Sequence, residues 1–439
     1  MTMKEVRILL RASILVTTLL ILGSGASTRE YTTYKTWDEV LAGTDAKYAP
    51  LVRVSDPGTD ASQVYTGFWF FGVDQFDSTE RYALGMKVYF QNRDVQPTDR
   101  ADIGYFDLKN HNHWTKIGET TAWNWQQGAR LQWRPRSDEI LWNDRSDDGK
   151  SFVCRVYNFK SKARRTLPRP IYDVSSDGKF ALTHDFARMK HGGTSYVGIP
   201  DLYAGQRAPA ATGIWKMDMK TGANQLIVDL ERMAKIAFPQ GYSGETDLYF
   251  FREGWNLSGS RFIAFLKNSS KPTYTTGWSI SADGKDIRFF YDEPSHHVWL
   301  DDQVLFEGNK FRLYQDDGSG RAEYLAQVDT NCDPTFLPGQ KNNWILADTY
   351  PIKGYQYLFL YHRPSGLFVP LAKLLNTAQP GIHRIDLHAR ASRNGRMISF
   401  DSSHEGKGRQ MYTVDIGYIL DRPPAAKDRD SGRPQPGRH

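Results

Sequence analysis

Short runs in which apolar and polar residues alternate recur along residues 65–416, separated by turn-forming residues. The clearest stretch is residues 386–416, DLHARASRNGRMISFDSSHEGKGRQMYTVDI. Its pattern predicts three strands, at Arg390–Ser392, Met397–Asp401 and Arg409–Ile416. Alternation places Ile398 and Phe400 on one face of the second strand. Asn394-Gly395 predicts a two-residue type I′ turn between the first two strands, because both residues tolerate positive φ.

Six earlier stretches repeat this pattern, and a small polar residue, Asp or Asn, Gly, then Lys or Arg mark several of their turns. The seven repeats are Tyr65 to about Gly118, Trp123–Leu167, Ile171–Asp229, a fourth from about Leu248, His296–Gln327, Cys332–Leu374 and Asp386–Ile416. The first repeat is expected to hold strands near Phe68–Phe71, Met86–Gln91 and Ile103–Asp107.

A single small sheet cannot bury both of its faces, whereas sheets stacked radially bury both, and a closed ring leaves only short edges. We therefore predict an all-β fold, a seven-bladed β-propeller over residues 65–420. Six blades are an alternative, because long loops blur the third and fourth repeats. A pair of packed sheets is the other alternative.

The two ends of the chain differ in composition from the repeats. Residues 1–26 combine Lys4, Arg7 and Arg11 with an apolar run too short to span a bilayer comfortably and end in Ser-Gly-Ala, which predicts a signal peptide and a secreted or periplasmic protein. An uncleaved N-terminal anchor is the alternative; after cleavage no membrane attachment is expected. Residues 27–64 are expected to be an irregular N-terminal segment with a short helix or strand at 37–41, and residues 421–439 a disordered tail.

Composition narrows the set of partners. Aromatic residues make up 13% of the chain, which suits cross-strand ring pairs or a surface that stacks on sugars. The net charge of +6 attracts anionic polymers, but no run of Lys and Arg exceeds two residues, which argues against nucleic acid. Cys154 and Cys332 fall in different repeats, so they would form a disulfide only across the molecule.

Several motifs resemble those of a known family. The last repeat carries Asp386-Leu387-His388, Phe400-Asp401-Ser402 and His404-Glu405-Gly406, and earlier matches include Ser295-His296 with Trp299, Pro334–Gly339, and Trp125–Gly128. Together they resemble TolB-like propellers related to oligogalacturonate lyases and ulvan lyases. This resemblance implies a seven-bladed propeller that cleaves acidic polysaccharides by β-elimination and holds a divalent metal near the central channel.

The resemblance also suggests ligands for that metal. His296, Cys332 and His388 stand at the starts of the fifth, sixth and seventh repeats, where inner strands face one channel. Two imidazoles and a thiolate suit Zn²⁺, in a structural or a substrate-neutralising role. The alternative is that the two histidines line the channel through backbone contacts and that Cys332 is a small buried hydrophobe.

β-Elimination next to a uronate carboxylate needs a cation on the carboxylate, a base and an acid. The run Leu182–Asp201 supplies candidates on an expected loop: Tyr196 as base or acid, Arg188 as the neutralising cation, and His184 or His191 as a substitute base. Arg252 is a second neutralising candidate. It stands, with Leu248, where many relatives carry paired histidines, and this departure weakens the analogy. The loop could instead be a solvated connection.

These observations predict an exported propeller that binds an acidic, uronate-containing polysaccharide or oligosaccharide and cleaves it by elimination. The alternative is a non-catalytic TolB-like propeller that binds glycans or partner proteins. A hydrolase on the same scaffold has little support, because the sequence contains no Gly-x-Ser-x-Gly motif.

Overall fold

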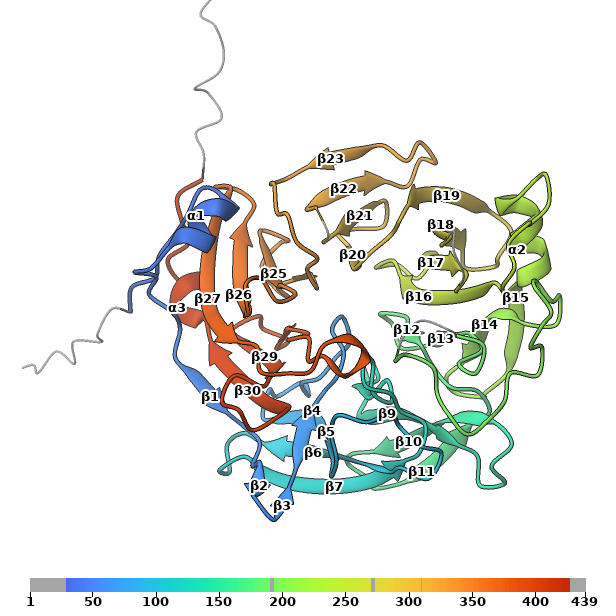
Figure 1. Cartoon of the computed structure of the whole chain (residues 1–439), viewed down its shortest axis with the longest axis horizontal. Helices are drawn as coiled ribbons and strands as arrows, with labels where there is room; N and C mark the ends of the chain where they lie inside the picture. Colours follow the sequence, from blue (N-terminus) through green and yellow to red (C-terminus); the bar gives the residue numbers. More distant parts are fainter. Residues whose placement is uncertain (1–28, 190–192, 270–272, 309, 427–439) are drawn as a thin grey trace, which may run out of the picture. The chain divides into compact units, whose positions relative to one another are not determined.

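Seven four-stranded antiparallel sheets follow one another around a central axis (Figure 1). The structure is a computed structural model, and it describes residues 29–189, 193–269, 273–308 and 310–426. The chain divides into two units, Met1–Glu30 and Tyr31–His439, and every described sheet lies in the second. The predicted seven-bladed β-propeller is confirmed. The predicted signal peptide lies outside the described residues.

Each sheet is built outwards from its first strand, and Figure 1 shows β12, β16 and β20 nearest the centre of the ring. The first strands are β4 (Tyr65–Gly67), β8 (Gln132–Trp133), β12 (Asp173–Val174), β16 (Tyr249–Trp255), β20 (His297–Trp299), β24 (Thr335–Phe336) and β28 (Arg390–Ala391). The second strands are β5 (Tyr82–Val88), β9 (Glu139–Arg145), β13 (Phe180–Thr183), β17 (Arg261–Lys267), β21 (Val304–Glu307), β25 (Trp344–Asp348) and β29 (Met397–Ser402).

The outer half of each sheet has the same antiparallel order. The third strands are β6 (Ala101–Asp107), β10 (Phe152–Asn158), β14 (Gly213–Asp218), β18 (Thr275–Ser281), β22 (Arg312–Gln315), β26 (Tyr355–His362) and β30 (Gln410–Asp415). The fourth strands are β7 (His113–Thr120), β11 (Arg164–Leu167), β15 (Asn224–Asp229), β19 (Ile287–Asp292), β23 (Ala322–Tyr324), β27 (Leu367–Leu375) and β1 (Leu51–Arg53). Outside the blades are a hairpin of β2 (Gly58–Thr59) and β3 (Ser62–Gln63), helices α1 (Trp37–Ala42), α2 (Leu230–Ala237) and α3 (Gly417–Leu420), and a 3-10 turn (Gly381–His383).

The last sheet is completed by the N-terminal part of the chain. β1 pairs with β30 in antiparallel register, with Leu51 opposite Val414 and Arg53 opposite Tyr412. The segment 27–64, which the sequence set apart from the propeller, therefore contributes a strand to it and joins the two ends of the ring in one sheet. Its residues 37–41 belong to helix α1, which a capping box between Thr36 and Glu39 begins.

The turn at Asn394-Gly395 differs from the prediction. A type I′ turn needs positive φ at both central residues, but of this pair only Gly395 has it, at 72°. The connection runs from Ser392 to Met397, and the Gly395 N–H donates to the Ser392 carbonyl oxygen at 2.8 Å. Asn394 acts through its side chain, which accepts from the Arg396 N–H at 2.8 Å. The same geometry recurs at Gly178 and Gly284, with φ of 74° and 73°.

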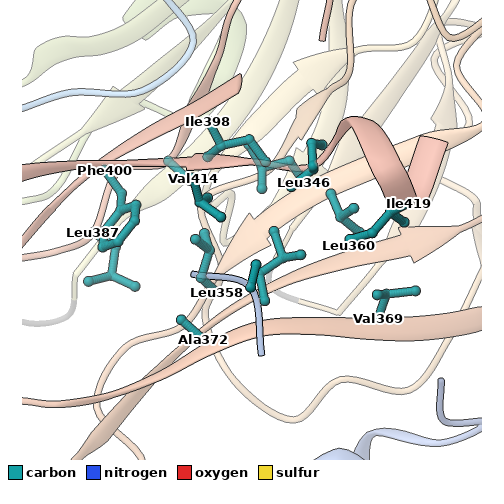
Figure 2. Packing of buried hydrophobic residues seen from close by; sticks show 14 of the residues in the cluster. Leu346, Leu358, Leu360, Val369, Ala372, Leu387, Ile398, Phe400, Val414 and Ile419 are labelled. Carbon is teal, nitrogen blue, oxygen red and sulfur yellow. The ribbon is translucent and has the colours of Figure 1, made fainter. Parts of the chain in front are cut away.

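The hydrophobic core lies between adjacent blades. Figure 2 shows the interface of the last two, where Leu358 and Leu360 of β26 face Ile398 and Phe400 of β29, with Ile419 of α3 beside them. Burial of each such side chain stabilises the fold by roughly 1.5–3 kcal/mol. Cys154 and Cys332 are both buried free thiols in separate clusters, so no disulfide joins them. No helix among the described residues is long and apolar enough to cross a membrane.

Candidate functional site

Three polar side chains meet near the axis at the entrances to the first strands of neighbouring blades. His296 directly precedes β20, Asp333 lies two residues before β24, and His388 lies two residues before β28. All three are buried. His296 Nε2 lies 2.9 Å from Asp333 Oδ1, and His388 Nε2 lies 3.4 Å from Asp333 Oδ2. The carboxylate of Asp333 therefore lies between two imidazoles that come from different blades.

A fourth blade contributes Arg252 from β16. A register shift interrupts the pairing of β16 with β17 between Phe251 and Gly254, and Arg252 has a positive φ of 57°. Left-handed backbone at a non-glycine residue is uncommon and costs free energy, and such residues cluster at functional sites. This conformation places Arg252 Nη2 2.6 Å from His296 Nε2. The other terminal nitrogen, Nη1, is buried and has no hydrogen-bond partner.

His296 has polar neighbours at both ring nitrogens. Its Nδ1 lies 2.9 Å from Asn331 Oδ1, and its Nε2 lies 2.6 Å from Arg252 Nη2 and 2.9 Å from Asp333 Oδ1. Burial alone would raise the pKa of Asp333, but the neighbouring imidazoles of His296 and His388 and the Arg252 guanidinium hold the pKa below its usual range.

Further ionisable groups surround this cluster. Burial lowers the pKa of His388 to about 3, so its imidazole is neutral at pH 7. Burial, then the charges of Asp333 and Asp386, raise the pKa of Asp348 well above normal. Arg384 pairs with Asp386 at 2.9 Å and donates to the Tyr350 hydroxyl at 3.2 Å.

Lys267, the last residue of β17, has the pKa closest to neutral among the shifted cations of this region. Burial, and then the charge of Arg252, lower the pKa of Lys267 to about 8. Its Nζ lies 5.8 Å from the centre of the Phe251 ring, next to Arg252 in the chain. A lysine in this state supplies an appreciable fraction of free amine at mildly alkaline pH.

Comparisons with known proteins identify the scaffold. No family model and no curated protein sequence matches the chain. Among solved structures, an oligogalacturonate lyase in complex with manganese superposes with a TM-score of 0.59 at 12% identity, over 90% of this chain and 98% of that one. An oligogalacturonate lyase from Vibrio parahaemolyticus superposes with a TM-score of 0.56 at 11% identity, over 88% and 97%.

The chain has the fold of the oligogalacturonate lyases. The resemblance inferred from the sequence motifs is thus confirmed at the level of the fold. The expected likeness to ulvan lyases stays a prediction.

The three expected zinc ligands, His296, Cys332 and His388, do not meet at one point. Cys332 belongs to an apolar cluster with Trp37, Phe306 and Tyr357, and burial raises the pKa of its thiol well above normal. The thiol therefore stays protonated in the protein interior, whereas a zinc ligand is a thiolate. The side chain that reaches the axis is that of the next residue, Asp333.

The remaining donors do not fit a resident metal either. His296 and His388 face different oxygens of Asp333, and the Arg252 guanidinium already occupies His296 Nε2. Across residues 29–426, apart from the masked gaps, no three His, Cys, Asp or Glu side chains form a group that could hold a metal ion. His296, Asp333, His388 and Arg252 therefore form a charge cluster, in which the Arg252 guanidinium contacts the His296 imidazole.

Tyr196, the expected base, is part of the core. Its ring stacks on Phe186 at 4.4 Å between centroids, and its hydroxyl accepts from Asn143 Nδ2 at 3.0 Å. Burial raises the pKa of Tyr196, whereas a tyrosine base needs a lowered one.

Arg188, the expected neutralising cation, holds its own loop together. It donates to the carbonyl oxygens of Leu248 at 2.7 Å and Tyr203 at 3.0 Å, and it contacts the Asp201 carboxylate at 3.3 Å. The connection between β13 and β14 is thus anchored in the interior over these residues.

The same connection, between β13 and β14, carries the two histidines expected as substitute bases, His184 and His191. His184 is buried, with Nδ1 2.7 Å from Glu253 Oε2 and its ring next to Phe186 and Tyr172. His191 lies outside the described residues. Of the five predicted catalytic residues, only Arg252 contacts the axial cluster in the part of the chain that the structure describes.

Sequence reasoning missed Asp333, Lys267 and Arg130. Asp333 follows the predicted ligand Cys332, and successive residues of an extended segment point to opposite sides, so either could have faced the axis. Lys267 and Arg130 carry no motif. The lowered pKa of Lys267 depends on burial and on Arg252 of the neighbouring strand, and Arg130 donates to the Tyr172 carbonyl oxygen of the next blade.

Proposed function

We propose that the protein binds an acidic, uronate-containing oligosaccharide at the axial cluster and cleaves it by β-elimination. The observation that carries this proposal is Arg252: a half-buried arginine on left-handed backbone, whose Nη1 group is buried and has no hydrogen-bond partner. A planar guanidinium recognises a carboxylate through paired hydrogen bonds. The fold shared with oligogalacturonate lyases supports the proposal as an analogy.

The chemistry assigns one role to each group. Arg252 Nη1 binds the uronate carboxylate and stabilises the negative charge that develops on it. The amine of Lys267 takes the proton from the carbon that bears the carboxylate. The electron pair of that C–H bond forms the new C=C bond, and the bond to the glycosidic oxygen breaks. Tyr350, whose pKa burial raises, keeps its proton at neutral pH and gives it to the leaving oxygen.

Metal ions enter this proposal only through the comparison. The manganese belongs to the matched structure, and in this proposal the Arg252 guanidinium supplies the positive charge that neutralises the substrate carboxylate. The predicted zinc has no support from the geometry. Export also stays part of the proposal: the predicted signal peptide would deliver the protein to the periplasm or the medium, where such polymers are encountered.

One observation favours the second candidate, a binding module without catalysis. Tyr196, expected as base or acid, and Arg188, expected as the neutralising cation, are built into the interior. A propeller that retained the oligosaccharide site but no base would still bind uronates through Arg252.

The test is the ultraviolet absorbance of an unsaturated uronate, measured with pectic, ulvan and glucuronan oligosaccharides. We expect a rise with at least one of them and a loss of about 100-fold or more in kcat for Lys267→Met. Lys285→Met is the matched control, because Lys285 lies on an exposed turn in the same blade. No rise with any substrate at high protein concentration would leave only the binding module, and equal rates for the two variants would remove Lys267 as base.

A further inference from the structure

A cavity of about 100 Å³ adjoins the charge cluster through Arg252, which belongs to both. Its wall combines aromatic rings with polar groups from the first strands of three blades, and Phe70 and Phe71 also line it. Arg252, Glu253 and Trp255 come from β16, and Asp173 from β12. The cavity therefore joins residues that only the closed ring brings together.

Three buried donors on this wall have no acceptor. They are Arg130 Nη1, Arg252 Nη1 and Trp255 Nε1. Arg130 and Trp255 are only 3% and 8% exposed. Buried polar groups in folded proteins are nearly always hydrogen-bonded, and each that is not needs an explanation. Three in one cavity wall point to an acceptor that arrives from outside.

Arg130 is fixed by its other contacts. Its Nε donates to the Tyr172 carbonyl oxygen at 2.8 Å, and its guanidinium lies 4.1 Å from the centre of the Tyr172 ring and 4.4 Å from that of Phe70. The residue also has a positive φ of 53°. Arg130 therefore cannot turn towards another acceptor without losing these contacts. The same contacts hold its Nη1 group at the cavity wall.

The acids in the wall are already engaged with other donors. Asp173 Oδ2 accepts from the Trp255 backbone N–H at 2.8 Å, and Glu253 faces His184 Nδ1 at 2.7 and 2.9 Å. Within the part of the chain that the structure describes, neither carboxylate forms a hydrogen bond with Arg130 or Arg252. The two acids do limit the charge of a ligand, because a dianion would be repelled more strongly than a monoanion.

We propose that this cavity is a carboxylate subsite that holds one uronate unit through Arg130, Arg252 and Trp255, and this inference rests on the proposed function. A carboxylate offers about four lone-pair positions in one plane, enough for three N–H donors. The rings of Phe70, Phe71 and Trp299 give the sugar an apolar wall. Phosphate fits less well, because it would bring a second charge next to Asp173 and Glu253.

The test is calorimetric titration of the full-length protein with galacturonate, with galactose as its neutral counterpart and acetate and phosphate as small anions. We expect galacturonate to bind at least about tenfold more tightly than the other three, because hydrogen bonds to a charged group would be lost with galactose and ring contacts with acetate. Equal affinity for galacturonate and galactose would overturn the carboxylate subsite. Acetate or phosphate binding as tightly as galacturonate would overturn its assignment to a uronate.

A matched pair of variants tests the donors. Trp255→Phe keeps a ring but removes the free N–H, and we expect about a tenfold loss of galacturonate affinity. Trp278→Phe is the control: Trp278 lies in the same blade but does not line the cavity, and its indole N–H already donates to Thr276 Oγ1 at 2.7 Å, so affinity should change less than about threefold. Equal losses in the two variants would refute the donor assignment. A second measurement, Arg130→Lys, keeps the positive charge but removes the fork and should weaken binding by about tenfold.

The subsite and the lyase reaction fail in different ways. Galacturonate binding that depends on Trp255, without any absorbance rise, would support the subsite and contradict the lyase reaction. An absorbance rise with unchanged affinity in Trp255→Phe would support the lyase reaction and overturn the subsite.

Discussion

Two buried aspartates near the axis, Asp401 and Asp333, have opposite surroundings. Asp401 Oδ1 accepts from Arg390 at 2.9 Å, and Oδ2 accepts from Arg409 at 3.1 Å. The backbone N–H groups of Phe68 and Trp69 also donate to this carboxylate, at 3.0–3.1 Å. Asp333, equally buried, meets neither a guanidinium nor a backbone N–H of the described residues at hydrogen-bond distance; its oxygens face His296 Nε2 at 2.9 Å and His388 Nε2 at 3.4 Å.

This difference indicates a structural role for Asp401 and a functional role for Asp333. A carboxylate that meets four donors is satisfied, and its free energy of burial is offset inside the protein. Asp401 thus joins the last blade to the segment that follows β4 in the first. Asp333 lies against imidazole nitrogens instead, and its negative charge fits a site that must hold cations or protons at the axis. Buried groups that lack partners are the ones to examine for function.

The largest expected effect is that of Asp401→Asn. The substitution leaves Arg390 and Arg409 buried without their counter-charge, and we expect the free energy of unfolding to fall by about 3–5 kcal/mol in urea denaturation. Asp421→Asn is the control, because Asp421 pairs with Arg396 on the surface of the same blade and should cost less than about 1 kcal/mol. Similar costs for both variants would show that Asp401 is not structural.

The same carboxylate sets a pH dependence. Burial alone would raise the pKa of Asp401, but Arg390 and Arg409 lower it below the normal value. A carboxyl group with a lowered pKa in the folded state stabilises the protein above its unfolded pKa of about 3.9, and this contribution is lost as the pH falls through the folded pKa. Asp401→Asn should therefore make stability less dependent on pH below about 4.

Asp333→Asn should have the reverse profile. The amide keeps an oxygen that can face His296 and can donate to the neutral His388, so the free energy of unfolding should change by less than about 1 kcal/mol. kcat/KM for elimination should fall about 100-fold, because His296 and Arg252 lose the charge that positions them. A loss of stability as large as that of Asp401→Asn would mean that Asp333 is a structural residue as well.

The sequence predicts the strands of the last blade well, and the structure shows why the first blade is harder. The predicted strands at 390–392, 397–401 and 409–416 match β28, β29 and β30 within two residues. Phe68–Phe71 has strand-like residues, yet β4 ends at Gly67, because the Phe68 and Trp69 N–H groups turn to Asp401 and Trp69 takes a positive φ of 70°. That partner lies more than 300 residues away, so local pattern cannot reveal it.

Residues of the site could be predicted from the sequence only where their position within a repeat determines that they reach the axis. His296 and His388 reach the axis because they precede first strands, and the repeat pattern locates those strands. Whether a polar side chain is satisfied depends on residues from other blades. Tyr196 and Arg188 have the right chemistry but find their partners in the interior, and nothing local in the sequence distinguishes them from Arg252.

A smaller effect is expected from pH on the reaction. Lys267 must lose its proton to act as base, so kcat/KM should rise about tenfold per pH unit up to about pH 8 and then level off. The Lys267→Met variant should lack this rise, whereas Lys285→Met should keep it. A wild-type profile that is flat between pH 6 and 8 would contradict Lys267 as the base.

The smallest effect on function is expected from Cys332→Ala, one residue from Asp333. Its thiol packs among Trp37, Phe306 and Tyr357, so truncation should lower the free energy of unfolding by about 1 kcal/mol through lost contacts. Galacturonate affinity, kcat/KM and the metal content found by elemental analysis should all match the wild type. A drop in metal content or activity would place the thiol at the axis after all. Unchanged values in Cys332→Ala, together with the loss of kcat/KM in Asp333→Asn, would show that Cys332 serves packing and that its neighbour Asp333, on the other side of the extended segment, serves the reaction.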